Sequence, residues 1–334
     1  MEKVKALHFL SGNGSFNQEL FDEIGSIPGI ELKLIENWES FTEDELVTII
    51  QDCDVLIASR APYIPDQLAE NPGRLKYICY LHGTMHRAIG LPIIQSDIQV
   101  TNWGDRAGKN LAQDSLVLLL SVFKDLPKRI MAVRGGEGGN ISSMGSSLSL
   151  LNIGIYGFGF SGREFARLVE SFGMNIRVYD PFVKDLPAHC EQVNSLKDLF
   201  ANSQAIVIHA GLTEGTENSI TRELLALLPD QGIIINTARG AIIDQEPFFD
   251  ELKSGRLRAG VDVLWPDNLP ADHEARQWEN LIWTCHQFGG SAWPSEGLKG
   301  RLRPFENFLN NIKAFVNGEE LKFIIDEERY KKMT

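Results

Sequence analysis

A glycine-rich hexapeptide and a later acid form the part of the sequence with the clearest chemical meaning. Gly157-Phe158-Gly159-Phe160-Ser161-Gly162 lies between a short apolar run and a helical pattern, and a second strand pattern ends 18 residues later at Asp180. With this spacing, the first glycine permits a tight turn, the second lets a pyrophosphate approach bare backbone, and the third lets helix and strand pack closely. The start of the helix would offer unpaired N–H groups and a positive dipole end to the phosphates. Asp180 would accept hydrogen bonds from both ribose hydroxyls and repel a 2′-phosphate, so the pattern predicts NAD rather than NADP.

An arginine, a carboxylate and a histidine each follow an apolar run in the second half of the chain. Arg239 follows the fourth run, Asp267 the fifth and His286 the sixth. If these runs are parallel strands of one sheet, their carboxyl ends share an edge, and ligands bind at that edge. The three side chains are then expected beside the cofactor, which suits hydride transfer to a carbonyl that neighbours a carboxylate.

Alternating strand and helix patterns must position these residues. From residue 149 onward, six short apolar runs alternate with amphipathic stretches, which fits a doubly wound parallel sheet. The six predicted strands cover 152–156, 175–179, 204–208, 232–236, 259–264 and 280–284. Predicted helices between them cover 161–172, 220–228 and 247–254.

The first hundred residues alternate in the same way and predict a second, smaller α/β domain. Its predicted strands cover 5–10, 30–35, 55–59, 75–81 and 99–102, and its helices cover 16–24, 43–52 and 65–70. A long connecting helix is expected over 108–123, and we interpret the glycine- and serine-rich stretch 134–148 as a surface loop rather than a lid or an interface arm. A helix over 297–316 is expected to return toward the first domain, where 323–325 would add a strand or pack.

The order and spacing of several motifs resemble the D-isomer-specific 2-hydroxyacid dehydrogenase family over most of the chain. These motifs are the glycine hexapeptide with Asp180, His209-Ala210-Gly211-Leu212-Thr213, Asn236-Thr237-Ala238-Arg239-Gly240, Asp262-Val263-Leu264, and His286 followed by Gly289-Gly290. The resemblance implies an α/β fold in which a Rossmann-type doubly wound parallel sheet domain, residues 105–291, binds NAD. It also implies a smaller, discontinuous, flavodoxin-like α/β substrate domain made of residues 1–104 and 292–334.

The resemblance implies catalytic roles for three residues. His286 would be the general acid in reduction and the general base in oxidation, for which an imidazole is suited near neutral pH. Arg239 would bind the substrate carboxylate with its planar fork and polarise the reacting carbonyl. Asp267 occupies the position of the family's glutamate, which hydrogen-bonds the histidine and stabilises its charged form. The alternative for Asp267 is a turn-forming loop residue.

The resemblance also assigns substrate and cofactor contacts. Backbone N–H groups of the loop His82-Gly83-Thr84 would hold the substrate carboxylate. The expected cofactor contacts are Gly157, Phe158, Gly159, Phe160, Ser161, Gly162, Asp180, His209, Ala210, Thr213, Thr237, Ala238, Arg239, Asp262, His286 and Gly289. His209 would end its strand near the cofactor phosphate or ribose rather than act as an acid or base. Asp262 is either close to the nicotinamide end or a buried structural acid.

The sequence departs from the family pattern at three places. The substrate loop continues as Met85-His86-Arg87 where the family commonly carries an aspartate and an asparagine. This change favours either a substrate with extra negative charge or hydroxyls, or a surface substitution outside the pocket. Gly211 stands where a proline is usual, and Asp267 is one methylene shorter than the family's glutamate. The substrate is therefore expected to be a small 2-hydroxy or 2-keto acid whose identity stays open.

Two other functions fit the same fold. One is an NAD(H)-sensing regulatory protein with little or no turnover, which the altered loop and the shortened acid would allow. The other is an enzyme that acts on formate or phosphite, which would need a tight polar pocket. Trp103 and Met85 suggest room for a larger substrate.

The composition argues against several function classes. The chain has 334 residues, of which 43% are hydrophobic, and no apolar run is long enough to span a membrane. A formal net charge of −13 argues against nucleic acid and anionic membranes as partners. The four cysteines form no CxxC pair, so neither a metal site nor a disulfide framework is expected. We expect a cytoplasmic protein, and the resemblance implies a homodimer.

Overall fold

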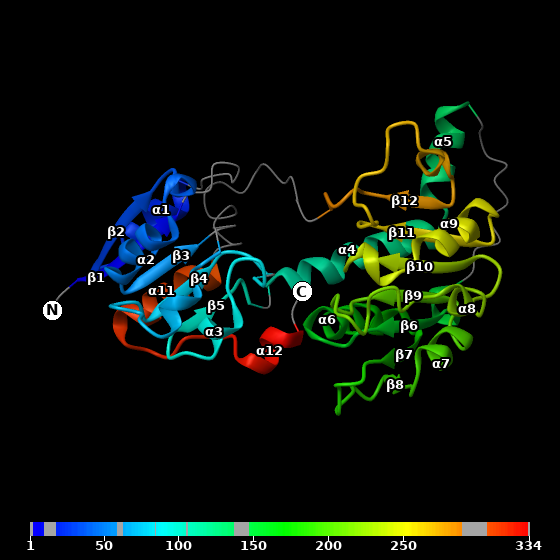
Figure 1. Cartoon of the computed structure of the whole chain (residues 1–334). Coiled ribbons are helices and arrows are strands. Elements are labelled where there is room, and N and C mark those ends of the chain that lie inside the picture. The colour runs from blue at the N-terminus through cyan, green and yellow to red at the C-terminus, as the bar shows by residue number, and fades with distance from the viewer. Residues whose placement is uncertain are drawn as a thin grey trace. The chain divides into compact units, whose positions relative to one another are not determined.

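The computed structural model describes residues 3–9, 18–58, 63–83, 85–104, 106–136, 147–288 and 306–332 (Figure 1). The chain divides into two compact units. The first comprises Met1–Ala107 and Ala292–Thr334, and the second comprises Gly108–Ser291.

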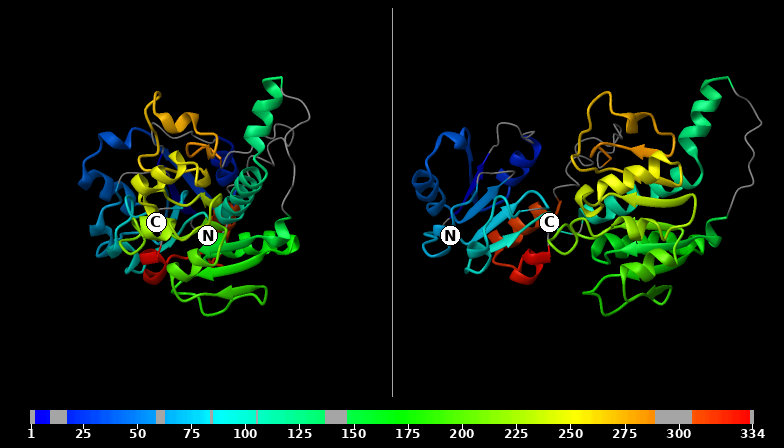
Figure 2. Two further views of the ribbon diagram at one scale, coloured as in Figure 1. Left: turned by 90° about the vertical axis from the view of Figure 1, so that its right-hand side faces the viewer. Right: turned by 45° about the vertical axis from the view of Figure 1, so that its right-hand side comes forward.

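A seven-stranded parallel sheet forms the centre of the second unit (Figures 1 and 2). Its strands are β6 (Asn152–Tyr156), β7 (Asn175–Tyr179), β8 (Cys190–Gln192), β9 (Ala205–Ile208), β10 (Gly232–Asn236), β11 (Leu257–Val261) and β12 (Leu281–Trp283). They run in the order β12-β11-β10-β9-β6-β7-β8, and every pairing is parallel. The order reverses between β6 and β9, which is the switch point of a Rossmann-type sheet.

Helices cover both faces of this sheet. They are α4 (Arg106–Phe123), α5 (Leu126–Arg134), α6 (Phe160–Val169), α7 (Leu196–Ala201), α8 (Arg222–Leu225) and α9 (Gln245–Lys253). Successive residues of β9 enter different cores, since Ile206 and Ile208 pack with α7, α8 and α9, whereas Val207 packs with α4 and α6. A strand that is covered on both faces must be apolar throughout, which is why β9 and β10 contain near-continuous runs of isoleucine and valine.

The first unit contains a five-stranded parallel sheet. Its strands are β1 (Val4–Phe9), β2 (Ile30–Ile35), β3 (Val55–Ala58), β4 (Tyr77–Tyr80) and β5 (Gln99–Thr101), in the order β2-β1-β3-β4-β5. This is the flavodoxin-like order. The helices are α1 (Gln18–Gly25), α2 (Glu43–Gln51), α3 (Leu91–Ile94), α11 (Glu306–Asn317) and α12 (Glu327–Lys332). From α11, Phe308 and Ile312 pack in one core with Tyr77, so a C-terminal helix covers a sheet formed by N-terminal residues.

The predicted fold class is confirmed, with differences at particular elements. The fifth strand of the second unit ends at Val261 rather than at 264, and the Asp262 carbonyl oxygen instead accepts from the His286 N–H of the turn after β12. The strand β8 and the helix α7 were missed, since each is too short to show a clear periodicity. The predicted helix over 65–70 is a 3-10 helix, Asp66–Ala69.

Two further segments can be compared with the predictions. Residues 323–325 pack on the first unit rather than form a regular strand, since Ile324 makes an isolated bridge to Thr101 and Ile325 is buried in the core. The helix α5 was not predicted, and residues 137–146 of the expected surface loop lie outside the described residues.

Candidate functional site

The glycine hexapeptide forms the turn between β6 and α6, and its three glycines are required for different reasons. Gly157 has a φ of +90°, and a Cβ there would lie 2.4 Å from the backbone nitrogen of Ala210. A Cβ on Gly162 would lie 2.3 Å from the carbonyl oxygen of Gly157. A Cβ on Gly159 would meet no protein atom within 4 Å. The packing of the chain therefore explains Gly157 and Gly162, whereas the bare backbone at Gly159 leaves space that suits a pyrophosphate group.

The start of α6 adds an electrostatic contribution to phosphate binding at the glycine turn. Gly159 is the residue before the helix and has no side chain to cap the first N–H groups. Those groups lack partners within the helix and carry the positive end of its dipole, so they favour a phosphate. Phe158 is fully buried beneath the turn, while Phe160 is 40% exposed at the first helical position. The Arg163 guanidinium lies 5.0 Å from the Phe158 ring centroid and supports the turn from the helix.

Asp180 lies at the carboxyl end of β7 and contacts the glycine turn directly. Its Oδ2 accepts a hydrogen bond of 2.7 Å from the Phe158 N–H, and its Oδ1 accepts one of 2.8 Å from the Phe182 N–H. Each carboxylate oxygen has a second acceptor direction. The carboxylate is thus held in place by backbone donors and can still accept from ribose hydroxyls.

The loop after β9 lies against the glycine turn. The His209 N–H donates to the Tyr156 carbonyl oxygen at 2.8 Å, and Ala210 packs on Gly157. Burial lowers the pKa of His209 to about 3, so this imidazole is neutral at neutral pH and is not a proton donor. Its Nε2 is buried without a hydrogen-bond partner among the described residues. Further along, the Thr213 N–H donates to Thr216 Oγ1 at 2.7 Å and closes the loop.

The turn after β10 carries Arg239, and hydrogen bonds hold its backbone in place. Asn236 is fully buried, and its side chain bonds the Arg239 carbonyl oxygen at 2.9 Å and the Ala238 N–H at 2.9 Å. Gly240 must be a glycine, because a Cβ there would lie 2.2 Å from the backbone carbon of Leu264. The Arg239 Nη1 donates to the Ala238 carbonyl oxygen at 2.7 Å. Burial lowers the pKa of Arg239, and the Asp267 charge opposes this shift.

His286 lies in a left-handed turn that Asp262 holds. Cys285 and His286 have φ values of 52° and 57°, which non-glycine residues rarely adopt. The Asp262 carbonyl oxygen accepts from the His286 N–H at 2.5 Å. Asp262 Oδ1 accepts from Thr284 Oγ1 at 2.5 Å and from the backbone N–H groups of Gln287 and Phe288 at 3.1 and 3.2 Å. Oδ1 of Asp262 therefore holds the turn in place. Oδ2 makes no hydrogen bond to the described residues and can accept one from a ligand.

Asp267 connects the histidine and the arginine. Its Oδ2 lies 3.2 Å from His286 Nδ1, and the two side chains are 51% and 55% exposed. The same carboxylate acts electrostatically on Arg239. The aspartate thus reaches the imidazole although it is one methylene shorter than a glutamate.

Two further polar residues of this edge, Ser115 and Asp114 of α4, were missed in the sequence. Ser115 and Thr237 are buried and share a hydrogen bond of 2.7 Å between their hydroxyls, which ties α4 to the turn that carries Arg239. Burial and the Asp262 charge raise the pKa of Asp114 to about 6. Both residues lie in the apolar helical pattern of α4, where a single serine or aspartate does not indicate a functional site.

The predicted substrate loop follows β4 in the first unit. His82 lies between Tyr80 and Trp103, with ring centroids 5.7 and 6.2 Å away. The Gly83 carbonyl oxygen accepts from Asn102 Nδ2 at 3.0 Å. Thr84, the third loop residue, and Gly289 of the expected cofactor contacts lie outside the described residues.

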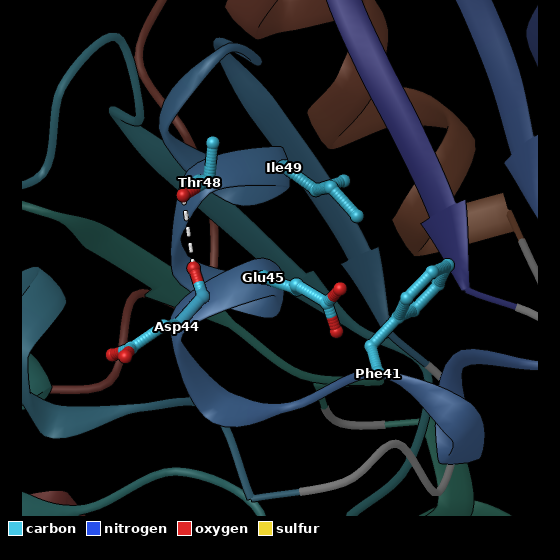
Figure 3. Close-up of a pocket in the computed structure, with 5 residues that line it drawn as sticks. All are labelled: Phe41, Asp44, Glu45, Thr48 and Ile49. Carbon is cyan, nitrogen blue, oxygen red and sulfur yellow. Dashed lines mark hydrogen bonds between the residues drawn. The ribbon is translucent and has the colours of Figure 1, made fainter.

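Other features of the described residues do not add to this site. A surface depression of about 320 Å³ in the first unit is lined by residues of α2 and the segment before it (Figure 3). It contains none of the predicted site residues; its lining is Phe41, Asp44, Glu45, Thr48 and Ile49. Within the described ranges, no group of three or more histidine, cysteine or acidic residues could hold a metal ion. No described helix combines the length and apolarity needed to cross a membrane.

Comparison with known proteins identifies the family. Residues 116–287 match the family model for the D-isomer specific 2-hydroxyacid dehydrogenase, NAD binding domain, which confirms the predicted cofactor class. A hydroxypyruvate reductase of Thermotoga maritima is 31% identical over 258 residues, which cover 74% of this chain and 82% of that protein. A D-3-phosphoglycerate dehydrogenase of Methanocaldococcus jannaschii is 26% identical over 89% of this chain, which spans 56% of that protein's length. The structure of D-2-hydroxyisocaproate dehydrogenase has the same fold, with a TM-score of 0.76 and 20% identity over 96% of this chain and 99% of that one. The chain therefore belongs to the D-isomer specific 2-hydroxyacid dehydrogenase family.

Proposed function

We propose that the chain is an NAD-dependent dehydrogenase that interconverts a D-2-hydroxy acid and its 2-keto acid. One observation carries the proposal: the Asp267 carboxylate lies 3.2 Å from His286 and also acts on Arg239, all beyond the carboxyl ends of β10, β11 and β12. Asp180 and the glycine turn lie at β6 and β7, on the other side of the switch point. A dinucleotide whose adenosine ribose binds Asp180 would extend its nicotinamide toward these three residues.

Each of the three residues has a defined chemical task in this proposal. NAD bound at the glycine turn and Asp180 would supply the hydride acceptor for oxidation at the 2-carbon, and NADH the hydride donor for reduction. Arg239 binds the substrate carboxylate and polarises the carbonyl, which its low-dielectric surroundings strengthen. His286 donates its proton to the carbonyl oxygen in reduction and accepts it in oxidation. Because Nδ1 faces Asp267, Nε2 is the nitrogen available to the substrate, and the carboxylate orients the ring.

The two units have different roles in this proposal. The second unit, Gly108–Ser291, carries the cofactor and the acid–base pair, and the first unit, Met1–Ala107 and Ala292–Thr334, carries the carboxylate-binding loop. The names of the relatives favour a small 2-keto acid, such as hydroxypyruvate. The complete arginine, aspartate and histidine set argues against an NAD(H)-sensing protein without turnover. The cytoplasmic location stays a prediction from the sequence.

A spectrophotometric screen tests the proposed activity. NADH or NADPH would be mixed with a set of 2-keto acids that includes glyoxylate, pyruvate and hydroxypyruvate. We expect steady loss of absorbance at the nicotinamide band with at least one acid. Absence of turnover with every 2-keto acid, although NADH binds, would support the regulatory alternative instead.

Replacement of Asp180 by serine is expected to weaken NADH binding by about tenfold, because hydrogen bonds to a charged group contribute about 1.5–3 kcal/mol. NADPH should bind more tightly to the variant than to the wild type, since the charge that repels a 2′-phosphate is gone. Titration of both cofactors by fluorescence measures the change. Asp185→Ser, in the same loop region, is the control and should leave both affinities unaltered. Equal NADPH affinity in wild type and Asp180→Ser would exclude Asp180 from cofactor discrimination.

The homodimer is proposed to form through α5. This helix projects from the second unit in Figure 2 and exposes Leu126, Ile130, Met131 and Val133 by 42% to 67%. Monomeric proteins rarely leave such a row of large apolar side chains in water. We expect Met131→Glu combined with Val133→Glu to convert a dimer into a monomer of 37.3 kDa in light scattering, whereas Lys128→Glu on the same helix should not. A wild-type monomer, or a dimer that survives the double change, would contradict the proposal.

A further inference from the structure

Two N–H donors lie side by side at the carboxyl edge of the first unit's sheet. One is the backbone N–H of Gly83, just after β4, and the other is the indole Nε1–H of Trp103, just after β5. Neither has a hydrogen-bond acceptor among the residues that the structure describes. A Cβ built on Gly83 would lie 2.5 Å from Trp103 Nε1, so the indole edge rests directly on this loop.

The position of the indole is fixed by a set of backbone contacts. Asn102 connects the two segments, because its Nδ2 donates to the Gly83 carbonyl oxygen at 3.0 Å while its Oδ1 accepts from the Gly104 N–H at 3.1 Å. The Trp103 carbonyl oxygen accepts from Asn307 Nδ2 of α11 at 3.0 Å. Gly104 has a φ of +67°, which only a glycine adopts readily, and this turns the chain after Trp103. The tryptophan is therefore held against the loop and is still 37% exposed.

The chemistry of this pair indicates an anionic acceptor. Both groups are donors only, and an indole N–H does not ionise near neutral pH. Two donors from neighbouring strand ends are the arrangement that a carboxylate accepts with its two oxygens. Gly83 has no side chain, so a ligand can reach its backbone N–H. A Cβ at this position would displace the indole.

We infer that Trp103 is a substrate-binding residue whose Nε1–H donates to the carboxylate of the 2-keto acid, beside the Gly83 N–H. This inference rests on the proposed function, since it takes the loop as the site of the substrate carboxylate. It adds a side-chain donor to a loop that was expected to use backbone groups alone. The N–H contact acts on substrate affinity, not on proton transfer.

Kinetics of Trp103→Phe test the inference, because phenylalanine keeps an aromatic ring but lacks the N–H donor and the second ring of the indole. We expect KM for the best 2-keto acid to rise about tenfold with kcat changed less than about twofold. This is the result of losing an interaction that the bound substrate and the transition state make equally. The affinity for NADH should not change. Trp38→Phe is the matched control, since its Nε1 is also without a partner among the described residues but lies beside α2. An unchanged KM in Trp103→Phe, while the wild type turns over, would overturn the inference and leave the proposed function intact.

An NMR titration gives an independent readout that does not require turnover. The chain has six tryptophans, and the Trp103 indole N–H signal is assigned from its absence in Trp103→Phe or Trp103→His. With NAD bound, addition of oxalate should move this signal downfield and leave that of Trp38 in place. A shift without any enzymatic activity would support the binding role and reject the proposed function. An indole signal that oxalate does not move would overturn the inference.

Discussion

Replacement of His286 by asparagine is expected to lower kcat by a factor of about 10² to 10⁴, the usual contribution of a general acid–base group. The imidazole is the group beside Asp267 that can carry a proton between substrate and solvent near neutral pH. Asparagine has no such proton, but it tolerates the left-handed backbone that His286 adopts at a φ of 57°. The turn and NADH binding should therefore survive, and the loss should appear in steady-state turnover alone.

Cys285→Asn provides the control for this prediction. Cys285 has a φ of 52° in the same turn, so its replacement by asparagine places the same demand on the backbone. Its thiol donates to the Asp267 carbonyl oxygen at 3.6 Å and has no task in the proposed mechanism. We expect turnover within about threefold of wild type, which is a change of less than about 1 kcal/mol. A His286→Asn variant that keeps wild-type turnover would remove the imidazole from the reaction.

Replacement of Arg239 by glutamine is expected to lower kcat/KM by about 10² to 10³, because the loss of one partner of a buried charge pair costs about 2–5 kcal/mol. Glutamine keeps most of the length and removes the charge. Arg239→Lys should lie between wild type and glutamine, since an ammonium keeps the charge but lacks the planar two-oxygen fork. Initial rates against 2-keto acid concentration measure the effect.

The control for Arg239 is an arginine of the same unit away from this edge. Arg222 pairs with Asp250 at 2.8 Å, and both side chains are more than half exposed. Exposed pairs contribute little to stability, so Arg222→Gln should leave kcat/KM unaltered. If Arg239→Gln retained the wild-type KM for every 2-keto acid, Arg239 would not be the carboxylate-binding residue.

The fold and the cofactor class could be predicted because short-range patterns determine them. The strands β6, β7 and β10 have the predicted bounds. β6 and β10 are short apolar runs, and β7 alternates apolar and polar residues. The glycine spacing is local within the hexapeptide, where Gly162 packs against the Gly157 carbonyl oxygen. The contact of Gly157 with Ala210 joins distant parts of the chain.

The contacts that orient the site could not be predicted, because they join residues far apart in the chain. The three hydrogen bonds of Asp262 Oδ1 hold the His286 turn, and its position in an apolar run gave only the alternatives of a cofactor contact and a buried acid. The hydroxyl pair of Ser115 and Thr237 spans 122 residues. The contact of Trp103 with Gly83 likewise depends on the pairing of β4 with β5, which no local pattern specifies.

Deuterium transfer from labelled NADH tests the central claim most directly. The chain would be incubated with a 2-keto acid that it consumes and with NADH deuterated at the transferable position of nicotinamide C4. The 2-hydroxy acid would then be analysed by mass spectrometry and by chiral chromatography. We predict a product of D configuration that carries the deuterium on its 2-carbon, and a loss of this product in His286→Asn. A product of L configuration, or one without deuterium on the 2-carbon, would contradict hydride transfer to a D-2-hydroxy acid.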